Sequence, residues 1–495
     1  MPTNIISNKY IKPVLSLTLL ILVYSCQNKQ ASDVNAERFD PVKESEKFSP
    51  PETRLIPKGT HAELGLAGYA KVFCSALFVS GREPEEAFKN SGFFFMAEDL
   101  QDKVTYSIDI DNKSVMLNLG DSIIRSAQYS GDQGCIITTT QGLQFEPVSV
   151  FTSLPDAMTQ DWPMGDKTSE ETSYGIDQDL LNEAVDLAFY HTEALTAAFL
   201  VIHKGKIIAE RYMEGIDKNT QLESWSMGKS LTATLIGRMI KQGYFKIDDP
   251  APVDEWQQEG DPRKEITIKN LLQMSAGLRF TSHRDPVLEQ DSKYLDHMFI
   301  YTGAVDAFEY SQKRPLQFPV GTVGRYRNCD PLTLGYIMRK ILEANGKSYL
   351  TYPQEELFDK IGIRKQMMET DPYGNFLLTG YDYGTARNWG RLGMLYLQDG
   401  AWNGDQILPD WWTEFVSTKA PAWEDPVYGG LFWINGNSSM PLPKDAYYMA
   451  GGGGQRTIIV PSMDLVVVRL GHFRGSAVGM ELLNKVLQKL VEAIN

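Results

Sequence analysis

The sequence has few of the residue types that build metal centres and histidine-dependent catalytic sites. Its 495 residues include six histidines and four cysteines, and they form no His-Glu-x-x-His motif and no Cys/His cluster of the kind that binds zinc. The sequence therefore predicts no metal site, and a metallohydrolase is disfavoured. A Ser-His-Asp hydrolase is disfavoured as well, because Ser224 stands where a Gly-x-Ser-x-Gly turn around Ser226 would need its first glycine.

Positive charge is also scarce. The chain has 48 Lys and Arg against 63 Asp and Glu, a formal net charge of −15. Proteins that bind nucleic acid rely on basic surfaces, so nucleic acid is not an expected partner. The apolar run near the N-terminus, Val14 to Val23, is too short for a comfortable membrane span. Lys9 and Lys12 precede it, which is the pattern of an export signal.

The end of this run resembles a bacterial lipobox, Val23-Tyr24-Ser25-Cys26. In such segments the signal is cut before the cysteine, and the cysteine is lipidated. The resemblance implies a signal peptide over residues 1–25, a lipid anchor at Cys26 as the only membrane contact, and a place in the bacterial cell envelope, periplasmic or surface-facing. The alternative is an ordinary secretory peptide. Residues 26–58 are polar and proline-bearing, as in a flexible tether, and the chain without residues 1–25 carries 46 basic and 63 acidic groups, a net charge of −17.

Residues 59–150 are predicted to form a small, separate β-rich domain whose role the sequence does not reveal. The predicted strands are Ala76–Ser80, Thr105–Ile110, Ser114–Leu119 and Cys135–Thr140. Cys74 and Cys135 could pair in an oxidising compartment, although two buried thiols would explain them nearly as well. Cys329 is expected to be a small buried apolar residue. Residues 151–175, which include Pro155, Pro163 and Gly165, are expected to link this domain to the next.

Residues 176–495 are predicted to form an α+β domain. A helix is expected over Gln178–Tyr190, and the terminal helix has one apolar face. Strand pairs are expected at both ends of the domain, at Ala198–His203 with Lys206–Met213 and at Arg456–Val460 with Leu465–Gly471. The residues between them are mostly helical. This order predicts one antiparallel sheet built from both ends of the domain and flanked by helices, with an inserted all-helical lobe and a small-molecule site in the cleft.

The main candidate for catalysis is Ser226 with Lys229, at the start of a helix predicted over Ser230–Gln242. At this spacing the two side chains share one face of the first helical turn. A serine hydroxyl is a weak nucleophile until a neighbouring base takes its proton. A lysine can be that base where burial and the positive end of the helix dipole disfavour its charged form.

Two later segments could complete the site. Tyr326 and Asn328 precede another helical run, and a tyrosine near a Ser–Lys pair can relay a proton to the leaving group. A second Tyr-x-Asn, at Tyr373, has a turn-forming context and is disfavoured. The segment from Met449 to Gln455 contains four consecutive glycines, which allow a strand edge to approach a ligand closely.

Ser-x-x-Lys, Tyr-x-Asn about a hundred residues later and a glycine-rich strand near the end together resemble the serine β-lactamase and penicillin-recognising hydrolase superfamily. Supporting similarities lie at Ile266–Leu278, Thr385–Gly393 and Trp402–Pro409. Within the superfamily, the similarity is closest to class C-like esterases and 6-aminohexanoate-dimer hydrolases. The resemblance implies Ser226 as nucleophile, Lys229 as general base and Tyr326 as proton relay, assisted by Asn328. It also implies that the N–H groups of Ser226 and Gly452 form the oxyanion hole and that Met449, Gly451 and Gln455 contact the substrate.

One departure from the family pattern bears on the substrate. Many relatives place Lys or His at the start of the third motif, where this chain has the apolar Met449. A lost charge-assisted contact of about 1.5–3 kcal/mol should weaken recognition of penicillin-type acids. We therefore expect an esterase or amidase acting on small acyl substrates. The alternatives are a D,D-peptidase that acts on cell-wall peptides and a catalytically inactive surface binding lipoprotein.

Overall fold

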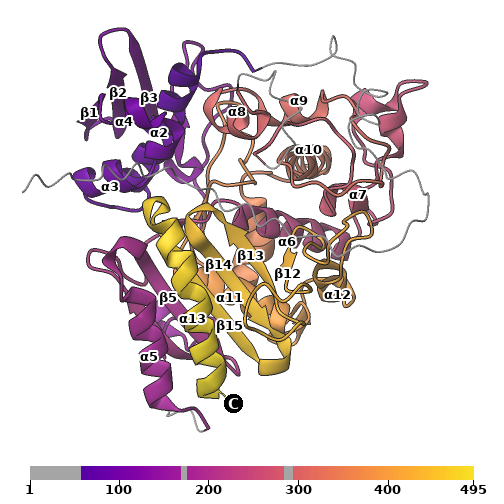
Figure 1. Cartoon of the computed structure of the whole chain (residues 1–495). Coiled ribbons are helices and arrows are strands. Elements are labelled where there is room, and N and C mark those ends of the chain that lie inside the picture. Colours follow the sequence, from indigo (N-terminus) through magenta and orange to yellow (C-terminus); the bar gives the residue numbers. More distant parts are fainter. Residues whose placement is uncertain (1–56, 169–174, 284–293, 495) are drawn as a thin grey trace, which may run out of the picture. The chain divides into compact units, whose positions relative to one another are not determined.

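A computed structural model describes residues 57–168, 175–283 and 294–494 of the chain (Figure 1). The predicted signal peptide, the lipidation site Cys26 and nearly all of the predicted tether lie outside these residues. Within the described ranges, no helix is both long and apolar enough to cross a membrane. The same ranges contain no group of three or more His, Cys, Asp or Glu side chains placed to hold a metal ion.

The N-terminal region combines helices with a four-stranded antiparallel sheet in the order β1-β2-β3-β4 (Figure 1). Its elements are α2 (His61–Phe78), α3 (Pro84–Asn90), α4 (Glu98–Gln101), β1 (Val104–Asp109), β2 (Ser114–Leu119), β3 (Ile123–Tyr129) and β4 (Cys135–Ile137). Helix α2 packs on β2, β3 and β4, and a disulfide between Cys74 and Cys135 joins it to β4. The structure thus decides between the paired and the unpaired alternatives for these cysteines.

The predicted strand at Ala76–Ser80 is wrong, because these residues end helix α2 and begin the turn after it. Thr60 and Glu63 form a reciprocal capping box that starts this helix, a signal that outweighs the short apolar run at its end. Strand β3 was not predicted. The region is therefore mixed α and β, rather than β-rich.

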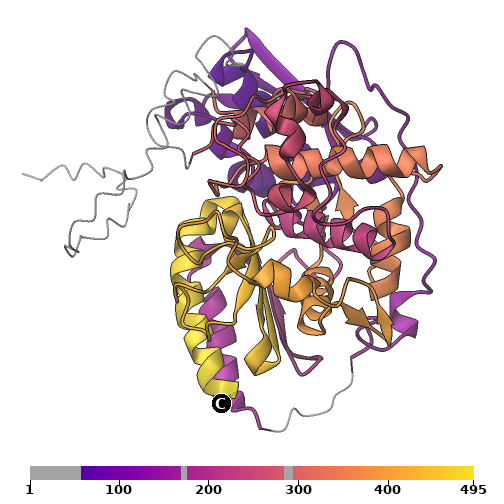
Figure 2. The same ribbon diagram turned by 90° about the vertical axis from the view of Figure 1, so that its right-hand side faces the viewer.

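The second domain is organised around a six-stranded antiparallel sheet in the order β12-β13-β14-β15-β5-β6. Its strands are β5 (Thr196–His203), β6 (Lys206–Tyr212), β12 (Trp433–Ile434), β13 (Tyr447–Gly451), β14 (Gln455–Val460) and β15 (Leu465–Gly471). Val201 of β5 pairs with Val467 of β15, so the two ends of the domain build one sheet, as predicted. Helices α5 (Gln178–Phe189) and α13 (Ser476–Ile494) lie side by side on one face (Figures 1 and 2).

The other face of the sheet carries the segment between β6 and β12. Its helices are α6 (Met227–Lys241), α7 (Ile268–Leu272), α8 (Asp296–Thr302), α9 (Ala307–Gln312), α10 (Cys329–Ala344), α11 (Ala386–Leu397) and α12 (Trp412–Ser417). Helix α11 packs on β5, β14 and β15, and α6 packs on β13. The lobe is not all-helical, since short strands form a sheet in the order β7-β9-β8 and a β10-β11 pair. These are β7 (Leu222–Glu223), β8 (Met367–Met368), β9 (Asp382–Gly384), β10 (Ala401–Trp402) and β11 (Asp405–Gln406).

The N-terminal region shares its hydrophobic core with the second domain. One cluster of buried residues runs from Leu66 and Phe73 of α2 to Trp225 and Leu231 beside and within α6, so the predicted separation of residues 59–150 is not reflected in the packing. The predicted linker is also held in place, since Arg391 of α11 donates hydrogen bonds of 2.7 Å to its carbonyl groups.

Candidate active site

Ser226 lies at the junction between β7 and helix α6. The Ser226 carbonyl accepts a hydrogen bond from the Lys229 N–H at 3.1 Å, and Ser226 occupies the N-cap position of the helix. The preceding residue, Trp225, has a φ of +48°. A bulky residue pays for this backbone conformation in strain, and such strain is concentrated at functional sites. The sharp turn presents the serine at the start of the helix.

Lys229 lies one turn along α6 and is almost completely buried, with 1% of its surface exposed. Its Nζ lies 3.0 Å from the Ser226 Oγ and 3.1 Å from the carbonyl oxygen of Thr379. The predicted nucleophile–base pair is therefore within hydrogen-bond distance. Burial disfavours the charged form of an amine, and this placement is suited to an exchange of a proton between the lysine and the serine.

Tyr326 is brought to the same place from the segment before α10. The Lys229 Nζ lies over its ring, 4.7 Å from the centroid, and the rings of Trp433 and Tyr428 pack against it at 5.3 and 6.0 Å. The disfavoured second Tyr-x-Asn lies elsewhere, with the Asn375 amide bonded to Asp371. Of these two tyrosine motifs, the one at Tyr326 is the one that contacts Lys229, and its catalytic role stays a prediction.

Asn328 is fully buried at the N-cap of α10. Its Nδ2 donates to the Tyr301 Oη at 3.1 Å and to the His297 carbonyl at 3.2 Å. Tyr301 in turn donates to the Thr379 carbonyl at 2.8 Å, the same oxygen that accepts from Lys229. Asn328 is thereby linked to the lysine through Tyr301 and Thr379. These hydrogen bonds hold the Lys229 side chain in place without a direct contact from Asn328.

The end of strand β13 reaches the nucleophile. A Cβ on Gly451 would lie 2.0 Å from the Ser224 carbonyl oxygen and 3.1 Å from the Ser226 nitrogen, so only glycine allows this approach. Gly452 follows directly and begins a short 3-10 turn. The predicted oxyanion pair, the N–H groups of Ser226 and Gly452, therefore comes from two backbone segments that lie against each other.

The other residues predicted in this motif have different surroundings. Met449 is fully buried and pairs with Thr457 in the sheet. Gln455 is also fully buried, and its amide exchanges two hydrogen bonds with the Gly471 backbone, at 2.5 and 2.8 Å. The prediction that Gln455 binds substrate is not supported, because its amide connects β14 to the end of β15.

Comparison with known proteins adds the family. A family model described as Beta-lactamase matches residues 181–491. The chain belongs to the beta-lactamase family. It is 26% identical over 301 residues to the 6-aminohexanoate-dimer hydrolase of Paenarthrobacter ureafaciens, a match that covers 57% of this chain and 74% of that protein. It is 23% identical over 326 residues to an uncharacterized protein of Alkalihalophilus pseudofirmus, over 59% of this chain and 88% of the relative.

Solved structures agree on the fold of this family. A penicillin-binding protein homolog from Caulobacter crescentus superposes with a TM-score of 0.50 at 16% identity, over 65% of this chain and 99% of the homolog. At this identity the likeness establishes the fold alone. The predicted superfamily and fold class are thus confirmed, and the family match begins after the N-terminal region.

Sequence reasoning missed Asp382, which underlies the active-site helix of this beta-lactamase-family chain. It lies on β9, its carbonyl accepts the Ser224 N–H at 2.9 Å, and its Oδ2 has no hydrogen-bond partner among the described residues. A Cβ on Gly228 would lie 1.9 Å from that oxygen. Burial, together with the charge of Glu369, raises the pKa of Asp382 to about 8, against the opposing effect of Lys229. No local sequence signal marks Asp382, because it meets α6 only through tertiary packing.

Tyr301 and Thr379 were missed for the same reason, since each comes from a segment far from the motifs. Burial raises the pKa of the Tyr301 phenol above its usual range, so this hydroxyl stays protonated and remains a donor.

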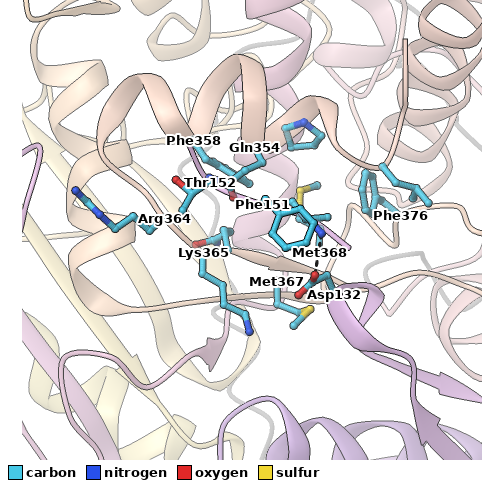
Figure 3. A pocket seen from close by; sticks show the side chains of 14 residues that line it. Asp132, Phe151, Thr152, Gln354, Phe358, Arg364, Lys365, Met367, Met368 and Phe376 are labelled. Carbon is cyan, nitrogen blue, oxygen red and sulfur yellow. Dashed lines mark hydrogen bonds between the residues drawn. The ribbon is translucent and has the colours of Figure 1, made fainter. Parts of the chain in front are cut away.

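A different cavity, of about 280 Å³, lies between the N-terminal region and residues 350–376 (Figure 3). Its lining includes Asp132, Phe151, Thr152, Phe358, Arg364 and Met368. None of the predicted catalytic residues lines it.

Proposed function

We propose that the protein is a serine hydrolase that cleaves small ester or amide substrates through an acyl-enzyme on Ser226. The observation that carries the proposal is the 3.0 Å separation of the Lys229 Nζ and the Ser226 Oγ at the start of a helix. Family membership supports hydrolytic chemistry. The named substrate of the Paenarthrobacter relative, a 6-aminohexanoate dimer, supports a small acyl substrate for this chain.

In the first half of the reaction, neutral Lys229 takes the proton of Ser226 while the Oγ attacks the substrate carbonyl carbon. The negative charge that develops on the carbonyl oxygen is stabilised by the N–H groups of Ser226 and Gly452. The bond to the leaving group then breaks, and the leaving alcohol or amine receives a proton through Tyr326, whose ring lies against Lys229. Asn328 positions the lysine through Tyr301 and Thr379.

In the second half, a water molecule attacks the acyl carbon of the ester on Ser226. The proton of this water passes to the neutral Lys229–Tyr326 pair. The pair then returns a proton to the Ser226 oxygen as the bond to the acyl carbon breaks and the carboxylic acid leaves. The residues assigned here perform both halves without a cofactor.

The substrate class follows from the third motif. Met449 supplies no charge where many relatives have a cation. Arg456 lies on the neighbouring strand, paired with Ala450, and its Nη1 donates to the carbonyls of Gly451 and Gln455. Its guanidinium is thus engaged with the glycine turn. We therefore expect weak recognition of penicillin-type carboxylates and little β-lactamase activity.

The test is covalent labelling of the soluble form that begins at Gln27. A fluorophosphonate should label Ser226, located by peptide mass, and Ser226→Ala should lose both the label and the turnover of a chromogenic ester panel. Ser230→Ala is the matched control, because Ser230 lies one turn further along α6 with its hydroxyl bonded to the Leu431 carbonyl. Label at another residue, or unchanged turnover in Ser226→Ala, would refute the assignment.

The main alternative, a D,D-peptidase, uses the same machinery. Release of D-alanine from a muropeptide at a higher kcat/KM than any ester of the panel would favour it.

We further propose that the protein is attached to the bacterial cell envelope through a lipid on Cys26. Cys26→Ala should abolish incorporation of an alkyne-tagged fatty acid and release the protein from the membrane fraction.

A further inference from the structure

An aromatic cluster joins the N-terminal region to the residue before the nucleophile. The ring of Phe94 stacks on Phe473, with 3.8 Å between centroids, and meets Trp225 edge-to-face at 5.3 Å. Phe473 meets the same indole at 5.7 Å. Phe94 and Phe473 are only partly buried, so the cluster keeps some accessible apolar surface, and Trp225 connects it to Ser226 along the chain.

The cluster also touches the proposed oxyanion hole. A Cβ on Gly452 would lie 3.0 Å from the Phe473 ring and 3.7 Å from the Cγ of Trp225. Tyr326, the proposed proton relay, packs with Trp433 and against Lys229. If the leaving group departs toward Tyr326, the acyl group, which remains on Ser226, is the part of the substrate left to contact the aromatic cluster.

The cluster is held rigidly by contacts from both regions. The Lys71 Nζ of α2 lies 4.6 Å from the centre of the Tyr381 ring, and that ring lies 5.6 Å from Trp225. On the outer side, the Arg474 guanidinium covers Phe93 at 3.7 Å, and its Nε donates to the Lys89 carbonyl at 2.9 Å. A binding surface fixed in this way loses little conformational entropy when it is covered.

We propose that Phe94 and Phe473 form the wall of the acyl-binding site and select substrates whose acyl group carries an aryl or long alkyl chain. The inference rests on the proposed function. It gives the N-terminal region a role that the beta-lactamase family match, which starts at residue 181, does not cover. Phe94 is a specificity-determining residue supplied by that region.

The test varies the acyl group and keeps the leaving group constant. With the soluble form that begins at Gln27, kcat/KM is measured for the p-nitrophenyl esters of acetate and 4-phenylbutyrate. Phe94→Ala should lower the ratio of phenylbutyrate to acetate by up to about tenfold, since a lost aromatic contact is worth about 0.5–1.5 kcal/mol. Phe94→Tyr should restore the ratio, and Phe151→Ala, which removes an aromatic side chain that is 80% exposed, should leave it unchanged.

A second readout separates this inference from the proposed function. Binding of 4-phenylbutyrate is measured by calorimetry in the Ser226→Ala background, with and without Phe94→Ala. Weaker binding of 4-phenylbutyrate in the Phe94→Ala protein supports the acyl wall. Absence of ester turnover in the wild type would refute only the hydrolase assignment, because the binding result does not depend on turnover. An unchanged ester ratio in a turning-over enzyme, or unchanged binding in the Ser226→Ala background, overturns the wall and leaves the hydrolase assignment intact.

Discussion

The pair of Lys71 and Glu369 provides the sharpest stability prediction. The two charged groups lie 2.8 Å apart with 2% and 0% of their side chains exposed. Glu369 also accepts hydrogen bonds from the Ser75 hydroxyl at 2.7 Å and the Cys135 N–H at 2.8 Å. Removing one partner from such a pair leaves an uncompensated buried charge, which costs about 3–5 kcal/mol.

The predicted experiment is a double-mutant cycle followed by denaturant unfolding. Glu369→Gln leaves the Lys71 ammonium without its counterion and should lower the free energy of unfolding by about 3–5 kcal/mol. Lys71→Met should cost less, because the Glu369 carboxylate keeps its two other donors. The double variant should be more stable than the sum of the single effects predicts, with a coupling energy of about 2 kcal/mol or more.

The pH dependence of the Glu369→Gln variant is a further check. Burial lowers the pKa of Lys71, and the Glu369 charge opposes that shift. Without Glu369, the folded state therefore holds the Lys71 proton less tightly than the unfolded state does. The variant should therefore regain stability as the pH rises from about 7 to 9.

The matched control is the surface pair of Lys489 and Glu183, at 2.6 Å with 37% and 58% of the side chains exposed. Lys489→Met and Glu183→Gln should each change the free energy of unfolding much less than the substitutions in the buried pair do. Equal effects in the buried and the exposed cycle would refute the reasoning, because they would show that burial does not set the cost.

Three other predictions concern the site and the core. Gly451→Ala places a Cβ 2.0 Å from the Ser224 carbonyl oxygen and should lower kcat/KM on a chromogenic ester about 100-fold by displacing the oxyanion hole; a loss below threefold would contradict this geometry. Because the pKa of Asp382 is raised to about 8, this group binds a proton in the folded state and not in the unfolded state between pH 6 and 8. Its contribution to stability therefore falls with rising pH by up to about 1.4 kcal/mol per unit, and Asp382→Asn should flatten the measured slope; an unchanged slope would count against it. Replacing Cys74 and Cys135 with serine opens a loop of sequence separation 61 and should cost about 2–4 kcal/mol in denaturant unfolding, whereas equal midpoints for the variant and the wild type would show that the disulfide does not stabilise the fold.

The parts of the fold that were predictable depend on local patterns. Helix α5 begins at Gln178 as predicted, and β5, β6, β14 and β15 match the predicted strand pairs within two residues, because the turn residues within each pair mark them locally. The helix at His61 was missed because its residues are buried on nearly all sides and show no amphipathic period. Strand β13, which ends at the glycines, was not predicted. It is stabilised by pairing with neighbouring strands on both of its edges, and its own short sequence carries no strand pattern.

The candidate site divides in the same way. Ser226 and Lys229 lie three residues apart at the start of one helix, so their spacing alone predicts their contact. Tyr326 needed the family resemblance to be joined to them. Asp382 and Phe94 could not be found from the sequence, because the contacts of Asp382 with the start of α6 and of Phe94 with Trp225 depend on how β9 and the N-terminal region pack.

The pairing of Val201 with Val467 has a consequence for biosynthesis. Strand β5 finds one neighbour, β6, across a tight turn, but its other edge stays unpaired until β15 has been synthesised more than 250 residues later. Until then an apolar hairpin edge is open to other chains, which is the condition that favours aggregation of newly made polypeptides. Nascent chains that stall before β15 are therefore expected to need a chaperone, whereas full-length chains can close the edge themselves.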